Sequence, residues 1–196
     1  MFTGIVQSLG VIRRLVPTPD GWQCTIDVPP RFGRLTQGMS LAVNGICVSV
    51  VTAEGRQCTL DIMPETRRRT TFRYWRVGDT VNLERPLRIG DEIGGHFVTG
   101  HIDGVGKIVD FKHDHETTLT IQVASSLMQY IAAQGAIAID GISLTVTRVR
   151  GAAFIVALIP YTSAHTTLGT RHVGDAVNVE VDLIARYVKR QRLYGP

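Results

Sequence analysis

Two histidines in a glycine-rich stretch are the side chains of this sequence best suited to moving protons. His96 and His101 lie in the segment GGHFVTGHIDG, and histidine is the side chain whose ordinary pKa lies nearest to neutral pH. The glycines around them allow the backbone to approach a ligand closely. The segment is therefore a candidate for general acid–base chemistry, although each histidine taken alone is more often structural or solvated.

Four small polar residues form a second candidate group. Cys47 and Ser49 lie in VNGICVSV, and Ser143 and Thr145 take the same places in DGISLTV. Alternate residues of a strand share one face of a sheet, so each pair is expected on one face. Two small polar side chains on one face could hydrogen-bond the edge of a flat polar ring in a ligand. For Cys47 alone, a small core residue is the ordinary role of a free thiol.

These two stretches belong to an internal repeat. The offset from Gly45 to Gly141 is 96 residues, and a fixed offset seen at many points indicates a duplicated domain. Where the copies differ, as where Ile5 faces His101, the difference indicates divided function or simple drift. The same offset aligns the following further residues: Thr3-Gly4 with Thr99-Gly100, Pro64 with Pro160, Thr70-Thr71 with Thr166-Thr167, Asn82 with Asn178, Glu84 with Glu180 and Pro86 with Asp182.

The pattern of both copies predicts an all-β fold. Asn44-Gly45 and Asp140-Gly141 favour tight type I′ hairpins. Many short strands with few helices indicate two homologous six-stranded Greek-key barrels with short helices and a C-terminal helix. Short helices are expected over 64–71 and over 125–131, the latter capped by Ser125. The expected strands are 4–13, 22–28, 40–43, 46–52, 56–63 and 80–84 in the first copy, and 100–109, 117–123, 136–139, 142–149, 154–159 and 176–181 in the second.

The tail of the chain departs from the repeat. We expect a first barrel over 1–96, a second over 97–183 and a helical segment over 184–196, with a linker over 85–95. The second barrel is complete before the tail begins, so the tail is expected to pack on another subunit. One face of the predicted helix carries Ile184, Tyr187, Val188 and Gln191.

Composition argues against several other classes of protein. The formal net charge is +4, and Arg67-Arg68-Arg69 is the only dense basic run. No aromatic platform accompanies it, which favours a solvated surface over a nucleic-acid site. No stretch has the apolar length of a membrane span. The odd number of cysteines, without metal-ligand spacing or a secretion signal, predicts reduced thiols in the cytoplasm. Phosphate-binding loops, dinucleotide fingerprints and HExxH patterns are absent.

Seven motifs taken together resemble those of the riboflavin synthase family. The resemblance covers essentially the whole chain and implies a cofactor-free dismutation in a homotrimer. Two molecules of 6,7-dimethyl-8-ribityllumazine would exchange a four-carbon unit to give riboflavin and 5-amino-6-ribitylamino-uracil. A duplicated fold suits a reaction that uses one compound as both donor and acceptor. The motifs are MFTGIV, VNGICVSV, MPETRRRT, GDEIGGHFVTGHIDGVG, DGISLTV, IPYTSAHTTLG and VGDAVNVEVD.

The resemblance also implies the site residues, and it places the two half-sites on different subunits. The resemblance does not identify the base. The residues implicated in turnover are Phe2, Cys47, His96, His101, Ser143, Thr145 and Asp182. We expect Phe2 to pack over the ligand or to close the first half-site. Those expected to bind substrate are Gly4, Ile5, Val6, Cys47, Val48, Ser49, Asp61, Ile62, Met63, Pro64, Glu65 and Thr66, and in the second copy Gly100, His101, Ile102, Gln134, Ser143, Leu144, Thr145, Leu158, Ile159, Pro160, Tyr161, Thr162 and Ser163.

Three departures from the family pattern and two rival functions accompany the resemblance. The C-terminal tail is short, which predicts weaker trimer contacts than is usual in the family. Ser49 stands where threonine is common, and Gln134 where lysine is usual, which removes a cation but leaves a hydrogen-bond donor. One rival is a non-catalytic paralogue that carries lumazine or flavin on the same double barrel. The other is a flavin-binding reductase barrel, although no nicotinamide domain follows. The presence of His96, His101 and Asp182 favours the enzyme.

Overall fold

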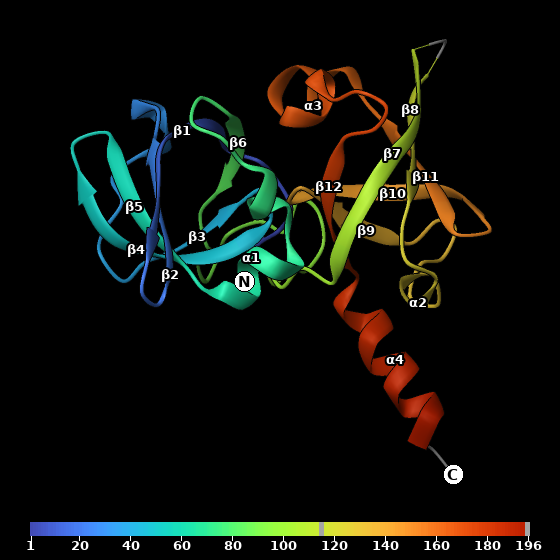
Figure 1. Ribbon diagram of the computed structural model, residues 1–196. Helices are drawn as coiled ribbons and strands as arrows, with labels where there is room; N and C mark the ends of the chain where they lie inside the picture. Colours follow the sequence, from blue (N-terminus) through green and yellow to red (C-terminus); the bar gives the residue numbers. More distant parts are fainter. Residues whose placement is uncertain (114–115, 195–196) are drawn as a thin grey trace.

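The computed structural model describes residues 1–113 and 116–194, and its strands form two closed six-stranded antiparallel barrels. The barrels lie side by side, the first drawn in blue to green and the second in lime to orange (Figure 1). The first contains β1 (Ser8–Thr18), β2 (Gly21–Asp27), β3 (Ser40–Val43), β4 (Ile46–Glu54), β5 (Gln57–Ile62) and β6 (Thr80–Glu84). The second contains β7 (Gly104–His113), β8 (Thr117–Gln122), β9 (Ala136–Ile139), β10 (Ile142–Arg150), β11 (Ala153–Leu158) and β12 (Ala176–Val181).

Both barrels have the same Greek-key strand order. In the first, β3, β4 and β5 are successive neighbours and β6 returns beside β3; in the second, β9 to β12 repeat the arrangement. Alternate strand positions point inward, so apolar residues such as Ile12 and Leu60 in one barrel and Ile108 and Phe154 in the other are wholly buried. The predicted fold class is confirmed.

The hairpin turns also follow the sequence. Asn44 and Gly45 have φ of 44° and 76°, and Asp140 and Gly141 have φ of 46° and 78°. Positive φ at both central positions is what a type I′ turn requires. The first strand of each barrel departs from the expectation: β1 and β7 begin at Ser8 and Gly104, later than the expected residues 4 and 100.

The helices are short except for the last. Those in the barrels are α1 (Pro64–Arg69), α2 (Ser125–Met128) and α3 (Pro160–His165), with 3-10 turns η1 (Pro30–Phe32), η2 (Thr71–Tyr74) and η3 (Thr167–Thr170). The expected cap at Ser125 is wrong, because Ala124 occupies the N-cap and no side chain caps this single turn. Proline starts α1 and α3, where its missing N–H costs nothing.

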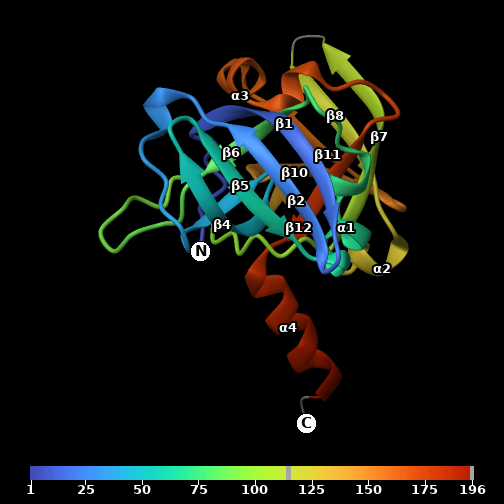
Figure 2. The ribbon, with the colours of Figure 1, turned by 60° about the vertical axis from the view of Figure 1, so that its left-hand side comes forward.

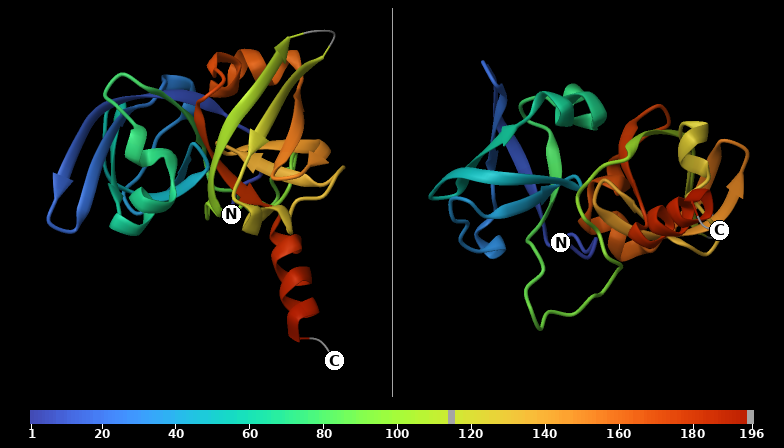
Figure 3. Two further views of the ribbon diagram at one scale, coloured as in Figure 1. Left: turned by 45° about the vertical axis from the view of Figure 1, so that its right-hand side comes forward. Right: turned by 90° about the horizontal axis from the view of Figure 1, so that it is seen from below.

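The tail helix α4 (Leu183–Tyr194) extends away from both barrels (Figure 2 and the left view of Figure 3). Ile184, Tyr187 and Val188 are exposed along it. Residues 195–196 of the expected helical segment lie outside the described part of the chain. Among the described residues, no helix is long and apolar enough to cross a membrane.

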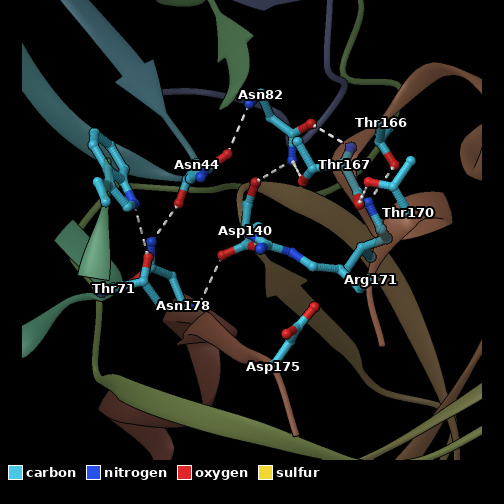
Figure 4. Close-up of polar contacts among 12 residues, drawn as sticks. Asn44, Thr71, Asn82, Asp140, Thr166, Thr167, Thr170, Arg171, Asp175 and Asn178 are labelled. Carbon is cyan, nitrogen blue, oxygen red and sulfur yellow. Dashed lines mark hydrogen bonds and ion pairs between the residues drawn. The ribbon is translucent and has the colours of Figure 1, made fainter. Parts of the chain in front are cut away.

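An approximate two-fold relation joins the barrels. Asn82 donates from Nδ2 to the Asp140 carbonyl oxygen, and its repeat partner Asn178 donates from Nδ2 to the Asn44 carbonyl oxygen, at 2.9 and 2.8 Å. Figure 4 shows these amides spanning the junction, beside an ion pair between buried Asp140 and Arg171. Such reciprocal contacts are those of a self-complementary interface. The two barrels of one chain therefore pack against each other like the two subunits of a symmetric dimer.

Candidate functional site

The segments before β1 and β7 cross between the barrels. We call residues 1–7 the first arm and residues 97–103 the second arm. Val6 of the first arm packs against the core of the second barrel, and Ile102 of the second arm packs against the core of the first. This crossing is why β1 and β7 begin later than expected. It also means that Gly4, Ile5 and Val6 lie with the second copy's residues, although they precede the first barrel in the chain.

A buried carboxylate holds each arm. Glu84 accepts hydrogen bonds from Thr3 N and Oγ1, at 2.7 and 2.8 Å, and from Gly4 N at 3.1 Å. Glu180 repeats the arrangement with Thr99 and Gly100. Burial raises the pKa of both carboxyls, and these hydrogen bonds oppose the rise. The repeat aligned both residues, but no sequence pattern indicated that they position candidate site segments.

The first candidate half-site lies on the outer face of β4, around Cys47. The Cys47 N–H donates to the Gly100 carbonyl at 3.0 Å, so the second arm lies directly against the strand. Gly100 has a φ of +81°, and a Cβ there would lie 2.5 Å from Cys47 Cβ, so only glycine fits. Burial raises the pKa of the Cys47 thiol, with a hydrogen bond involving Ser40 among the opposing effects. Ser40 was not among the predicted site residues.

The second candidate half-site contains a hydrogen-bonded serine–histidine pair. Ser143 N donates to the Gly4 carbonyl at 2.7 Å, and Ser143 Oγ lies 2.7 Å from His96 Nδ1. His96 Nε2 is buried without a hydrogen-bond partner among the described residues. Burial lowers the pKa of His96, and the negative charge of Asp182 opposes this. The structure thus brings together Ser143, His96 and Asp182, which the resemblance named separately.

The other predicted residues fall into three groups. Ser49, Asp61 and Thr145 are exposed on the outer barrel faces. Exposed in the short helices and loops outside the strands are Met63, Pro64, Glu65, Gln134, Ile159, Pro160 and Tyr161, whereas Thr66, Thr162 and Ser163 are half-buried. Four expected substrate-binding residues have side chains in the barrel cores instead, because the inward positions of their strands are filled by apolar residues. These are Val48, Ile62, Leu144 and Leu158, so only their backbones remain for a ligand.

Phe2 occupies the junction of the barrels. It forms an antiparallel bridge with Val98, its repeat partner, and both side chains are buried with Ala42 and Ala138. Cys47 packs against this cluster. The ring is wholly buried, and through Cys47 its cluster adjoins the first half-site. That Phe2 closes this half-site stays a prediction.

A separate cleft of about 960 Å³ lies between the barrels. It is lined by residues that include Tyr74, Trp75, Lys107, Gln122 and Arg171. None of the residues predicted to bind substrate lines it. Size alone would favour it as a ligand site, but the predicted polar groups converge elsewhere.

Comparison with known proteins identifies the fold family. The Lumazine binding domain family matches residues 3–86 and again 99–182. A riboflavin synthase of Brucella abortus (strain 2308) is 38% identical, covering 99% of both chains. One from Chlamydia trachomatis is 40% identical over 95% of this chain and 92% of its own. The crystal structure of LumP complexed with riboflavin has a TM-score of 0.85 at 29% identity, covering 92% of this chain and 99% of that one.

These matches span both barrels and both arms, and the two halves of the match repeat the offset found in the sequence. The chain therefore belongs to the riboflavin synthase family.

Proposed function

We propose that this chain catalyses the dismutation of two molecules of 6,7-dimethyl-8-ribityllumazine into riboflavin and 5-amino-6-ribitylamino-uracil. The observation that carries the proposal is the pair of similar but unequal half-sites, Cys47 in one and Ser143 with His96 in the other. The reaction uses one compound in two roles, donor and acceptor of a four-carbon unit. Because the unit passes between identical molecules, atoms and electrons balance without an added oxidant or reductant.

In the proposed reaction the second half-site carries proton transfer. The ring methyl groups must lose and regain protons, and a neutral histidine is suited to accept them. We assign this role to His96, acting through the Ser143 hydroxyl 2.7 Å away. The lowered pKa keeps the imidazole neutral, and so able to accept a proton, at neutral pH. Holding two reactants in place supplies a further part of the rate, up to roughly 7–11 kcal/mol.

A productive site is proposed to join half-sites from neighbouring chains of a homotrimer. Ser49 and Thr145 are exposed in the single chain, whereas small-molecule sites bury most of their ligand. Facing a second half-site would exclude water from both. The exposed apolar residues of α4, namely Ile184, Tyr187 and Val188, supply surface for assembly. The cysteines are unpaired, which agrees with a cytoplasmic protein.

The alternative is a non-catalytic carrier of lumazine or flavin. LumP, which has been crystallised with 6,7-dimethyl-8-(1'-D-ribityl) lumazine, with riboflavin and with flavin mononucleotide, has the same fold. Its identity to this chain is 29%, below the 38% and 40% of the enzymes above. The histidine–serine pair further favours catalysis.

The decisive experiment incubates the purified protein with the lumazine alone and follows riboflavin absorbance. We expect turnover, with two lumazines consumed for each riboflavin formed. The uracil product should appear in equal amount, detected by mass. Tight binding of the lumazine without any riboflavin would support the carrier and reject the enzyme.

A further inference from the structure

The tail helix α4 fastens the second arm at His101. One guanidinium nitrogen of Arg186 donates to the His101 carbonyl oxygen and to Asp103 Oδ2, each at 2.9 Å. Asp103 Oδ2 also accepts the Val181 N–H at 2.8 Å. The second arm, the end of β12 and the first turn of α4 therefore meet at one carboxylate oxygen.

The first arm keeps only part of this arrangement. Gln7 stands where Asp103 stands in the repeat, and its Oε1 accepts the Arg85 N–H at 3.0 Å, as Asp103 accepts that of Val181. Gln7 is a neutral amide and makes no ion pair. Both arms thus accept a backbone N–H at this position, and the second arm has in addition the ion pair between Asp103 and Arg186. The ion pair occurs on the second arm, which carries His101; the matching residue of the first arm is Ile5.

The contacts of Arg186 are partly buried and can hold the backbone of the second arm in place. The side chains of Arg186 and Asp103 are 29% and 20% exposed, so their ion pair is less screened than one on the open surface. Ile102, between the two bonded residues, packs on the core of the first barrel. The His101 side chain is exposed, and Arg186 bonds to the backbone carbonyl of the same residue.

We propose that Arg186 is a positioning residue that holds the backbone of His101. The position of His101 then depends on how α4 packs. The inference rests on the proposed function and adds that His101 serves the first half-site, because the carbonyl of the preceding residue, Gly100, accepts the Cys47 N–H. Because α4 carries the exposed apolar face available for assembly, a shift of the helix against a neighbouring chain moves Arg186. The His101 backbone then moves with it. Misplacement by about 1 Å is enough to slow a reaction up to about 100-fold.

The test compares Arg186→Ala, Arg186→Lys and Asp103→Asn in the full-length chain, with Lys189→Ala on the next turn of α4 as a matched loss of charge. We expect Arg186→Ala to lower kcat about tenfold and change KM by less than about twofold. The imidazole NMR signals of His101 should shift in the same variant. Arg186→Lys should recover part of kcat, and Lys189→Ala should match the parent protein in both measurements.

Asp103→Asn separates positioning from assembly. It keeps an acceptor for the Val181 N–H, as Gln7 does in the first arm, and leaves α4 unchanged. We expect it to lower kcat in the same direction as Arg186→Ala while sedimentation shows the parent assembly. Parent kcat with unshifted His101 signals in Asp103→Asn or Arg186→Ala would overturn the proposal, as would an equal loss in Lys189→Ala. A parent protein without turnover would reject the proposed function instead, and the His101 signals would still decide the positioning.

Discussion

Removing the hydroxyl of Ser143 should identify which half-site moves protons. The Ser143→Ala change leaves the backbone bond from residue 143 to Gly4 in place, so it removes only the 2.7 Å contact with His96 Nδ1. That distance is a direct proton-transfer distance, and a positioned acid–base group typically contributes about 10²–10⁴ in rate. Taking the lower end, we expect kcat to fall about 100-fold, or about 2.7 kcal/mol of transition-state stabilisation.

The partner change is His96→Asn, whose amide oxygen can accept from Ser143 but cannot take a proton. If both residues act through one bond, the double variant should be no slower than the slower single variant. The assay is single-turnover formation of riboflavin, with lumazine binding measured separately by fluorescence. Thr147→Ala is the control, because Thr147 is exposed further along the same strand and its hydroxyl donates to the Ile155 carbonyl.

The pH dependence gives an independent check. A base must be unprotonated, so kcat should fall as pH drops through the pKa of His96, which burial places below the ordinary 6.5. Asp182 raises that pKa, so Asp182→Asn should lower it and move the acidic limb of the profile to lower pH. An acidic limb that moves upward or stays in place, or additive losses in the double variant, would refute the assignment of His96.

Three further predictions address the architecture. Glu84→Gln should destabilise the fold by about 1–3 kcal/mol in urea unfolding, because the NH2 of the glutamine side chain, a donor, must replace an oxygen that accepts from a donor such as Gly4 N–H; an unchanged midpoint would contradict the bonding shown. A chain truncated after Asp182 should sediment as a smaller species, whereas an intact trimer would show that the barrels hold the assembly. Cys47→Trp and Ser143→Trp should each be nearly inactive, yet regain part of the activity when refolded together. Mixed trimers without any rescue would place the whole site within one chain.

The sequence by itself determined the repeat, the barrels and the hairpins. Strand alternation and the Asn-Gly and Asp-Gly dipeptides are local signals, and each acts over a few residues. The strands β3, β6, β9 and β12 begin and end where the pattern places them. Glycine at positions 45 and 141 serves a second purpose that only the structure shows, since a Cβ at Gly45 would lie 2.6 Å from Gly141 N across the junction.

Only the tertiary structure decided which segments meet. No local pattern shows that the first arm lies against Ser143 or that the second lies against Cys47, because each contact joins residues far apart in the chain. The same holds for the pairing of His96 with Ser143 and of Arg186 with Asp103. The repeat aligns Thr3 with Thr99, but aligned residues are equivalent in the two copies and need not touch. Whether an arm stays on its own barrel or crosses depends on the packing of two complete domains, and that packing exists only once both barrels have formed.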